Sequence, residues 1–261
     1  VGTTSQMMGW IVDEYSTIHG RYTPSVATGK PLGGGGSQGR TESGGYGVAV
    51  TIHEAMRHLG MSPEHTSAAF QGFGNLAQHA ALTFSEQLGG RVECVSYWDR
   101  HDRASHSISK AGGVNVRYLI SITDQFGCID KDLALRESYL VEGGDAWLSK
   151  DVDVLVPAAL EGQIHAENAD SISGRVRIIA EGANSAISAE VEARLMARNI
   201  HVIPDFLCNS GGLVCSYLEE VQCKAELYWS REAVLSEIRR IMTDAYMEMT
   251  ALCEREKVAP R

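Results

Sequence analysis

A short glycine-rich segment, Gly72-Phe73-Gly74-Asn75-Leu76-Ala77, has the spacing of a phosphate-binding turn. It matches G-x-G-x-x-G/A, in which the first glycine makes a tight turn and the second lets the backbone approach a pyrophosphate. An apolar run precedes it at 67–71, and a helical pattern follows at 75–88. The first N–H groups of that helix would point at the phosphates. The segment therefore predicts a dinucleotide site that includes Gly72, Phe73, Gly74, Asn75 and Leu76.

An acidic residue near the end of the next strand usually holds the adenosine ribose of such a cofactor. Asp99 stands at a suitable distance, shortly after an apolar run at 92–96. Its neighbours Arg100, His101 and Arg103 could instead receive the 2′-phosphate of NADP, and a solvated charged loop is the non-functional alternative. The pattern favours NAD and leaves NADP as the alternative cofactor.

Alternating strand and helix patterns surround this turn. Strands are predicted at 67–71, 92–96, 118–123, 152–156, 176–180 and 201–203, and helices at 3–19, 48–59, 75–88, 130–138, 166–172, 188–198, 211–222 and 231–256. Strands that are apolar on both faces and separated by helices predict an α/β fold. We expect a Rossmann-like, doubly wound, mostly parallel sheet with flanking helices and a helical C-terminal tail.

The composition limits the partners. The chain has 261 residues, 44% hydrophobic and 21% charged, which suits a protein with a buried core. A formal net charge of −10 argues against nucleic acid and anionic membranes, and no apolar run is long enough to span a membrane. The six cysteines have no CxxC spacing, so we expect buried thiols in a reducing cytoplasm and no metal site.

Seven further motifs follow one another in the order found in one enzyme family. They are TGKP at 28–31, GSQGR at 36–40, PAAL at 157–160, AEGAN at 180–184, PDF at 204–206, NSGG at 209–212 and SYLE at 216–219. On these motifs, essentially the whole chain resembles the cofactor domain of the glutamate/leucine/phenylalanine/valine dehydrogenases, in the glutamate branch. The resemblance implies NAD(P)-dependent oxidative deamination of L-glutamate to 2-oxoglutarate and ammonia by the full-length enzyme.

The resemblance also implies roles for single residues. Asn184 and Asn209 would contact the nicotinamide and its ribose, and Ala158 and Ala159 would leave room for the adenosine side. Arg40, in the segment that leads into the cofactor domain, would be a further cofactor-binding residue. Asparagine near a helix start can instead be a cap.

The substrate side rests on Ser216, whose hydroxyl would bind the distal carboxylate of the amino acid substrate, or would cap a helix. A hydroxyl there favours glutamate over leucine or phenylalanine. Glu181 and Asp205 are either site residues or polar ends of strands.

Two departures from the family pattern stand out. Where the family usually has Ala-Thr-Gly, this chain has Ser43-Gly44-Gly45, and Gly44 cannot supply the threonine hydroxyl that would bond the nicotinamide carboxamide. The segment 98–118 resembles an insertion, and the family's second strand usually leads to a segment resembling 122–127. Asp124 is therefore a rival to Asp99 for the ribose.

The resemblance places the catalytic lysine and aspartate in a substrate domain that precedes the motifs found here, so no catalytic residue is assigned to this chain. Val1-Gly2-Thr3 resembles the residues that follow the family's Pro-Asp segment, and Lys30 is interpreted as a loop or hinge residue. We expect a hinge segment at 1–30, a dinucleotide-binding domain at 31–208 and helices at 209–261 that pack towards the absent domain. The isolated chain would bind cofactor without turnover, and the full-length protein would be a homo-oligomer. A leucine- or phenylalanine-type enzyme and a non-catalytic nucleotide-binding scaffold are the alternatives.

Overall fold

The centre of the molecule is a seven-stranded sheet with the strand order β4-β3-β2-β1-β5-β6-β7. The computed structural model describes residues 3–260, so the first two residues of the Val1–Thr3 motif lie outside the described chain. The strands are β1 (Ser67–Gln71), β2 (Arg91–Asp99), β3 (Ala104–Ser109), β4 (Leu140–Gly143), β5 (Val154–Pro157), β6 (Ile178–Ala180) and β7 (His201–Ile203). β1, β2, β5, β6 and β7 are parallel, whereas β3 runs antiparallel to β2 and β4. The predicted mostly parallel, doubly wound α/β fold is confirmed.

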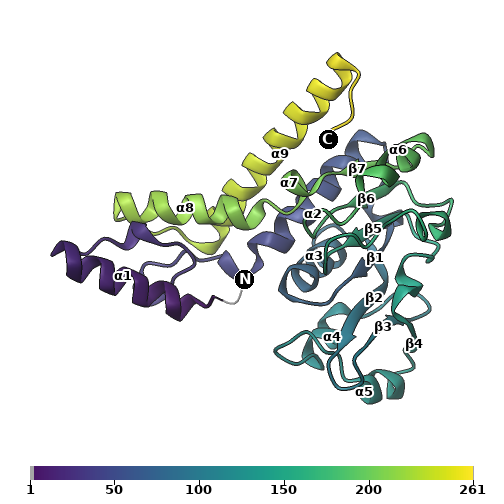
Figure 1. The fold of residues 1–261 in the computed structure, drawn as a ribbon, viewed down its shortest axis with the longest axis horizontal. Coiled ribbons are helices and arrows are strands. Elements are labelled where there is room, and N and C mark those ends of the chain that lie inside the picture. Colours follow the sequence, from purple (N-terminus) through teal and green to yellow (C-terminus); the bar gives the residue numbers. More distant parts are fainter. Residues whose placement is uncertain (1–2, 261) are drawn as a thin grey trace.

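Helices flank the sheet and extend from it (Figure 1). They are α1 (Ser5–His19), α2 (Arg40–His58), α3 (Asn75–Glu86), α4 (Val116–Ser121), α5 (Lys131–Arg136), α6 (Ala189–Ala197), α7 (Asp205–Cys208), α8 (Gly211–Ala225) and α9 (Arg231–Glu256). Short 3-10 turns occur at η1 (Pro24–Val26), η2 (Leu32–Gly34), η3 (Pro63–His65), η4 (Gly144–Trp147) and η5 (Ala169–Ser171). In Figure 1, α1 and α8 project together to one side of the sheet, and α9 runs from there back towards α6 and β7.

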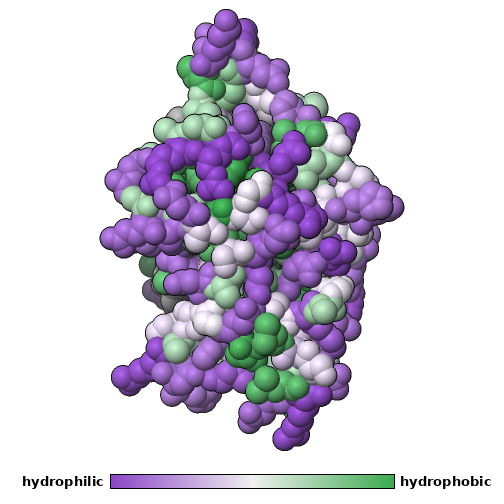
Figure 2. All heavy atoms as spheres, turned by 90° about the vertical axis from the view of Figure 1, so that its right-hand side faces the viewer, coloured by the Kyte–Doolittle hydropathy of each residue, from purple (hydrophilic) through white to green (hydrophobic). Residues whose placement is uncertain are grey.

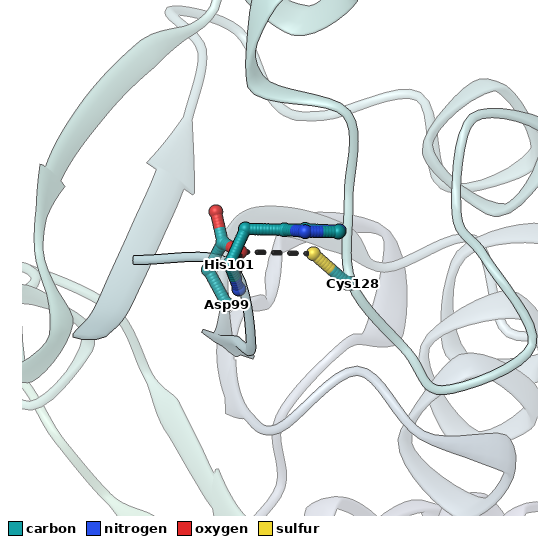
Figure 3. A group of neighbouring side chains, drawn as sticks. All are labelled: Asp99, His101 and Cys128. Carbon is teal, nitrogen blue, oxygen red and sulfur yellow. Dashed lines mark hydrogen bonds between the residues drawn. The ribbon is translucent and has the colours of Figure 1, made fainter. Parts of the chain in front are cut away.

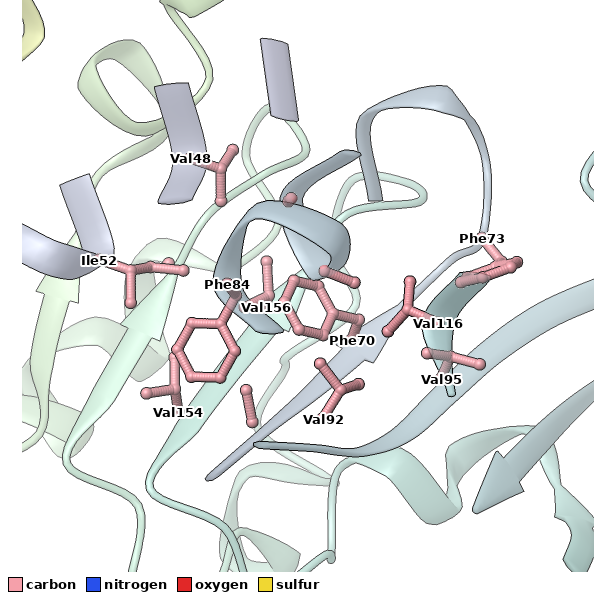
Figure 4. Packing of buried hydrophobic residues seen from close by; sticks show 14 of the residues in the cluster. Val48, Ile52, Phe70, Phe73, Phe84, Val92, Val95, Val116, Val154 and Val156 are labelled. Carbon is pink, nitrogen blue, oxygen red and sulfur yellow. The ribbon is translucent and has the colours of Figure 1, made fainter. Parts of the chain in front are cut away.

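The central strands β1, β5 and β6 are buried on both faces, and successive side chains of a strand point to opposite faces. In β1, Ala68 and Phe70 belong to the cluster under α2 and α3, whereas Ala69 belongs to the cluster under α6. Figure 4 shows the first cluster, where Phe84 of α3 packs beside Phe70 with ring centroids 6.3 Å apart. This two-sided burial explains why the strands read as continuous apolar runs.

The clearest error of the sequence analysis is the strand predicted at 118–123. The residues from Val116 to Ser121 form helix α4, and the side chain of Asn115 caps it by accepting a hydrogen bond of 3.0 Å from the Tyr118 N–H. Val116 and Leu119, one helical turn apart, pack into the core. Half of the six residues of α4 are β-branched or aromatic, a composition that also suits a strand, and the tertiary contact decided between helix and strand.

The segment 98–118 is part of the sheet. β2 continues to Asp99, and β3 returns beside it from Ala104 to Ser109 in antiparallel register. The sequence analysis did not predict β3, β4 or α7, and the helix predicted at 166–172 is reduced to the three-residue turn η5.

Helix α1 begins where Thr4 accepts a hydrogen bond from the Met7 N–H, and it ends at Gly20 with a φ of 64°. Val12 is its only buried residue, and Ile18 is 70% exposed. The apolar face predicted for 3–19 is therefore mostly uncovered in this structure.

Figure 2 shows another face, the right-hand side of Figure 1, which is mostly hydrophilic with small separate apolar groups. Within residues 3–260, no helix combines the length and the apolar character that crossing a membrane requires.

Glycine positions bring α2 close to two other helices. At Gly45, a Cβ atom would collide with the backbone of Leu76 and Ala80 in α3. At Gly47, a Cβ atom would lie 2.8 Å from the Cα of Gly211 in α8. Backbones can approach this closely only where side chains are absent. The N-terminal parts of α2, α3 and α8 are therefore held together.

Candidate functional site

The predicted motifs gather at one edge of the sheet. β1, β5, β6 and β7 run parallel, so their carboxyl ends lie at the same edge, and each is followed by one of the motifs. β2, the next strand along the chain, pairs with one edge of β1, and β5 pairs with its other edge, so the strand order reverses at β1. Ligands of open α/β sheets bind in the crevice at such a reversal of strand order. The turn after β1 occupies this position.

The turn is built by two glycines with different requirements. Gly72 has a φ of 90°, and a Cβ atom there would lie 3.0 Å from the Ala159 Cβ and 3.1 Å from the Ala158 oxygen. Gly74, the N-cap of α3, has no atom within 4 Å of where its Cβ would be. The first helical hydrogen bond runs from the Gln78 N–H to the Gly74 oxygen, at 2.9 Å. The N–H groups of Asn75 and Leu76 come before this first bond along the chain, so no carbonyl of the helix accepts from them and they point out of its N-terminus.

The side chains of the turn hold its shape. Phe73 is 2% exposed and lies in the core cluster of Figure 4, so only its backbone faces the crevice. The Asn75 amide donates a hydrogen bond of 2.7 Å to the Thr41 oxygen of α2. Leu76 lies against Gly182, where a Cβ atom would be 3.1 Å from the Leu76 Cδ2. The contribution of these residues to an anion site is therefore made through main-chain N–H groups.

Two neutral side chains complete the edge beside β5. The Gln71 Oε1 accepts a hydrogen bond of 3.2 Å from the Ala159 N–H, and the Gln71 Nε2 donates one to Gln163. Ala158 is half-buried and Ala159 is exposed. Small side chains thus border the crevice here, as the resemblance implies. The glutamine pair was not predicted, because the two residues are far apart in the sequence.

The two asparagines expected near the nicotinamide meet at the far end of this edge. The Asn209 Nδ2 donates a hydrogen bond of 2.6 Å to the Asn184 Oδ1. Asn184 is exposed and Asn209 is half-buried. The loop after β6 and the turn after α7 thus bring the two amides together at the carboxyl edge of the sheet.

Glu181 and Asp205 hold these loops. Glu181 is fully buried and accepts hydrogen bonds of 2.9 Å from the Ile187 N–H and 3.2 Å from the Asp205 N–H. Asp205 accepts a hydrogen bond of 2.7 Å from the Ser185 N–H. Both carboxylates therefore anchor the backbone beside the asparagines.

Arg40 and Ser216 contact one another between α2 and α8. The Arg40 Nη1 donates hydrogen bonds to the Ser216 Oγ and, at 2.7 Å, to the Gly212 oxygen. The Ser216 hydroxyl donates to the same Gly212 oxygen at 3.2 Å. Arg40 is one residue from Thr41, whose oxygen accepts the Asn75 amide, so this pair lies next to the glycine-rich turn. A positive charge and a hydroxyl side by side suit a carboxylate or a phosphate.

The two acids considered for the ribose line one cavity of about 500 Å³ at the end of β2. Asp99 is 3% exposed, and its Oδ2 lies 2.7 Å from the Lys131 Nζ. The hydrogen bond from Lys131 holds the pKa of Asp99 far below its usual range. Asp124 is half-buried, and its Oδ1 accepts a hydrogen bond of 2.8 Å from the Phe126 N–H. Asp124 is thus the more accessible of the two.

This cavity adjoins the glycine-rich turn. A Cβ atom on Gly127 would lie 3.2 Å from the Phe73 oxygen and 3.5 Å from the Gly74 nitrogen. The loop from Asp124 to Cys128 therefore packs directly against the turn. The ion-pair partner Lys131 was missed by the sequence analysis, since nothing in the sequence ties it to Asp99.

Lys30 lies in the loop between η1 and η2, as expected, but it is buried in an ion pair that was not predicted. Its Nζ lies 2.5 Å from the Glu219 Oε1, and neither side chain is exposed to solvent. The Gly29 N–H also donates to Glu219, at 3.0 Å and 3.1 Å to its two oxygens. A fully buried pair with these extra hydrogen bonds fixes the 28–31 segment to α8.

Gly44 leaves room at the position of the expected threonine. A Cβ atom there would lie 3.5 Å from the Leu76 Cδ1, which is ordinary contact. A side chain can therefore begin at this position without displacing its neighbours.

Residues 35–261 match the glutamate/leucine/phenylalanine/valine dehydrogenase family, and the chain belongs to that family. It is 35% identical over 261 residues to the NAD-specific glutamate dehydrogenase of Clostridioides difficile, covering 100% of this chain and 60% of the relative. It is 35% identical over 257 residues to the NADP(+)-dependent glutamate dehydrogenase of Pyrobaculum calidifontis, covering 98% of this chain and 59% of the relative. The chain thus spans about three fifths of the length of these relatives.

The fold matches a solved structure from the same group. The hetero-hexameric glutamate dehydrogenase of Thermus thermophilus, in its Leu-bound form, superimposes with a TM-score of 0.84 at 28% identity. The match covers 100% of this chain and 59% of that chain. The resemblance found in the sequence, to the glutamate branch of this family, is confirmed.

Proposed function

We propose that this chain is the NAD(P)-binding domain of a glutamate dehydrogenase. The observation that supports this most directly is the open N-terminus of α3 at the reversal of strand order. There the N–H groups of Asn75 and Leu76 precede the first helical hydrogen bond, and Gly74 has no neighbour within 4 Å of its Cβ position. A pyrophosphate would lie against these N–H groups, which carry the positive end of the helix dipole.

The rest of the dinucleotide extends in both directions from this point. The adenosine half enters the cavity between Asp99 and Asp124, where Asp124 presents the accessible carboxylate for a ribose hydroxyl. The nicotinamide half reaches Asn184 and Asn209, whose amides orient the ring for hydride transfer. Four aspartates and one lysine line the cavity, and this negative balance favours NAD over the extra phosphate of NADP.

Glutamate is the substrate that Ser216 favours, and Arg40, which the sequence predicts to bind the cofactor, contacts Ser216 and lies within reach of the same ligand group. A hydroxyl beside a guanidinium can bind the distal carboxylate, which leucine and phenylalanine lack. In the full-length enzyme the nicotinamide would supply the hydride acceptor for the α-carbon of glutamate, and hydrolysis of the resulting imine would give 2-oxoglutarate and ammonia. The lysine and aspartate that would assist belong to the substrate domain of the family pattern, and no motif of this chain matches them. The chain alone therefore binds cofactor without turnover.

The same proposal divides the chain into a hinge segment at 1–30, a dinucleotide domain at 31–208 and C-terminal helices at 209–261. It also makes the full-length protein an oligomer, as the hetero-hexameric Thermus thermophilus relative is, and we propose that its subunits are identical.

Calorimetric titration with NAD and with NADP tests the binding part. We expect saturable binding, tighter for NAD. A chain that is folded by circular dichroism and binds neither dinucleotide would favour a non-catalytic scaffold instead.

The assignment of catalysis is tested with saturating NAD and glutamate, by the absorbance of reduced nicotinamide. No turnover is expected from the chain by itself. Steady reduction of NAD would show that the catalytic groups lie within these residues.

A further inference from the structure

Three side chains with different metal-binding atoms meet in the wall of the cavity at the end of β2. They are the carboxylate of Asp99, the imidazole of His101 and the thiol of Cys128 (Figure 3). One ligand atom from each lies within 4.8 Å of the others. Asp99 and Cys128 are buried, and His101 is exposed and directed towards Cys128. We propose that these residues bind a zinc-class divalent cation.

The spacing of the two buried ligand atoms fits such an ion. The Cys128 Sγ lies 3.4 Å from the Asp99 Oδ1, joined by a hydrogen bond. A tetrahedral zinc ion with bonds of about 2.3 Å to sulfur and about 2.0 Å to oxygen separates those two atoms by about 3.5 Å. The cation therefore replaces the thiol proton with little movement of either side chain. That proton passes to solvent when the sulfur–metal bond forms.

Lys131 supports this arrangement from the other side of Asp99. Its Nζ lies 2.7 Å from the Asp99 Oδ2, which leaves Oδ1 to face Cys128. The His101 N–H also donates to Oδ1, at 2.8 Å, and thereby fixes the carboxylate plane. A partner that fixes a ligand from outside the coordination sphere is usual in metal sites.

A second cluster of possible metal ligands lies beside the first, but the ammonium group of Lys131 occupies it. Asp99, Asp102 and His106 also lie within 4.8 Å of one another. There the Lys131 Nζ lies 2.5 Å from the Asp102 Oδ2 and 3.4 Å from the His106 Nε2. The ammonium group already fills that cluster, so the metal site is the one containing Cys128.

The surroundings favour a cation and leave it an open position. Asp124, Asp130 and Asp132 line the same cavity of about 500 Å³ together with Asp99, against the single lysine Lys131. Arg100, the other nearby cation, lies 3.5 Å from Asp124. Three protein ligands beside a cavity leave one coordination position for water. Thiolate and imidazole select zinc-class ions over magnesium or calcium.

No spacing in the sequence indicates this site, since Cys128 stands 27 residues after His101 and the cysteines have no CxxC spacing. Its ligands lie in the wall of the cavity that the proposed function assigns to the adenosine half, so metal binding is tested on the chain without dinucleotide. Metal binding there ties the loop from Asp124 to Cys128, which packs on the glycine-rich turn, to the sheet.

Cobalt(II) is the probe for the test, because a tetrahedral site with one thiolate gives visible bands and a near-ultraviolet sulfur-to-cobalt charge-transfer band. The chain, stripped with chelator, is titrated with Co²⁺, then with Zn²⁺, and separately with Mg²⁺. We expect one equivalent of Co²⁺ with both kinds of band, displacement by Zn²⁺, and a rise in melting temperature with Zn²⁺ but not with Mg²⁺. Absence of a charge-transfer band overturns the proposal.

Three variants assign the signal. Cys128→Ser keeps a group that can donate to Asp99 but removes the sulfur, so the charge-transfer band is lost. His101→Ala changes an exposed side chain, so the fold is kept and the Co²⁺ affinity falls about tenfold or more. Cys253→Ser alters a partly exposed thiol outside the cluster and serves as the matched control. Loss of the band in Cys253→Ser, or its retention in Cys128→Ser, refutes the site. Dinucleotide titration of the metal-free chain tests the proposed function separately.

Discussion

Replacing Gly74 with alanine separates cofactor binding from folding. Gly74 has an extended backbone, with a φ of −76° and a ψ of −178°, and no atom lies within 4 Å of the position its Cβ would take. The added methyl group would therefore enter the space assigned to the pyrophosphate and touch nothing in the protein. Dinucleotide affinity should fall while the fold remains intact.

The expected change in stability is small because two effects oppose one another. Alanine restricts the unfolded chain, which stabilises the fold by about 0.4–1 kcal/mol. Alanine is also a poorer N-cap than glycine, at a cost of about the same size. A net change below about 1 kcal/mol corresponds to a shift in melting temperature of about 2–4 °C or less.

The expected change in affinity is larger. If the methyl group displaces the pyrophosphate from one backbone N–H, the loss is one charge-assisted hydrogen bond, about 1.5–3 kcal/mol. That corresponds to an increase in Kd of about 10- to 150-fold, at 1.4 kcal/mol per factor of ten. Isothermal titration calorimetry with NAD measures it directly.

Two other glycines provide the comparison. Gly174 precedes β6 at the opposite edge of the sheet and also has no neighbour within 4 Å, so Gly174→Ala should leave the affinity unchanged and raise stability by about 0.4–1 kcal/mol. Gly72→Ala should lower stability, because a φ of 90° costs about 1–2 kcal/mol for a residue with a Cβ atom. Wild-type affinity in Gly74→Ala would refute the placement of the pyrophosphate.

Three further changes have definite expected outcomes. At Gly44 a Cβ atom would have only ordinary contacts, and Gly44→Thr adds the hydroxyl that the family pattern has there. Calorimetry should show NAD binding that is tighter by about 0.5–1.5 kcal/mol. An unchanged Kd would contradict a contact between this position and the nicotinamide carboxamide. Glu219→Gln leaves the buried Lys30 ammonium without its counter-charge and should lower the free energy of unfolding in urea by about 3–5 kcal/mol. The control Glu220→Gln changes an exposed ion pair and should lower it by less than about 1 kcal/mol. Equal losses in the two variants would contradict the structural role of the buried pair. Burial lowers the pKa of His201 from 6.5 to about 4, so the unfolded chain binds more protons and stability falls, by at most about 3 kcal/mol, as the pH drops from 6.5 to 4. The free energy of unfolding, measured at several pH values, should fall less between pH 6.5 and pH 4 for His201→Asn than for wild type. An equal fall in both proteins would contradict the prediction.

The elements that could be predicted carry strong local signals. β1 and α9 have the predicted bounds, and α3 begins at the predicted Asn75. Each has a local signal in the sequence: a continuous apolar run for β1, the capping residue Ser230 for α9 and the glycine-rich turn for α3. Helix α2 shows the limit of this reasoning. It begins at Arg40, before the pattern predicted at 48–59, because its first half contains glycines that interact with other helices rather than an apolar stripe.

Short elements were decided by their partners. The 116–121 segment became a helix because Val116 and Leu119 could both reach the core from one helical face. β3 and β4 exist because β2 extends far enough to offer an open edge, to which β3 pairs in antiparallel register. No local signal distinguishes such segments from loops or from the opposite element.

The sequence by itself determined the family, the α/β class and the glycine-rich turn, since these depend on residue types at fixed short spacings. Only the tertiary structure decided which carboxylate is the more exposed, since Asp99 is paired with Lys131 and Asp124 with Arg100. Asp99 and Asp124 are equivalent candidates along the chain, but folding brings Lys131 onto Asp99 and leaves Asp124 at the cavity rim. It likewise placed Cys128 beside Asp99 and His101. Contacts between residues 27 or more positions apart depend on how the strand and loops pack, and that packing is not encoded in any local spacing.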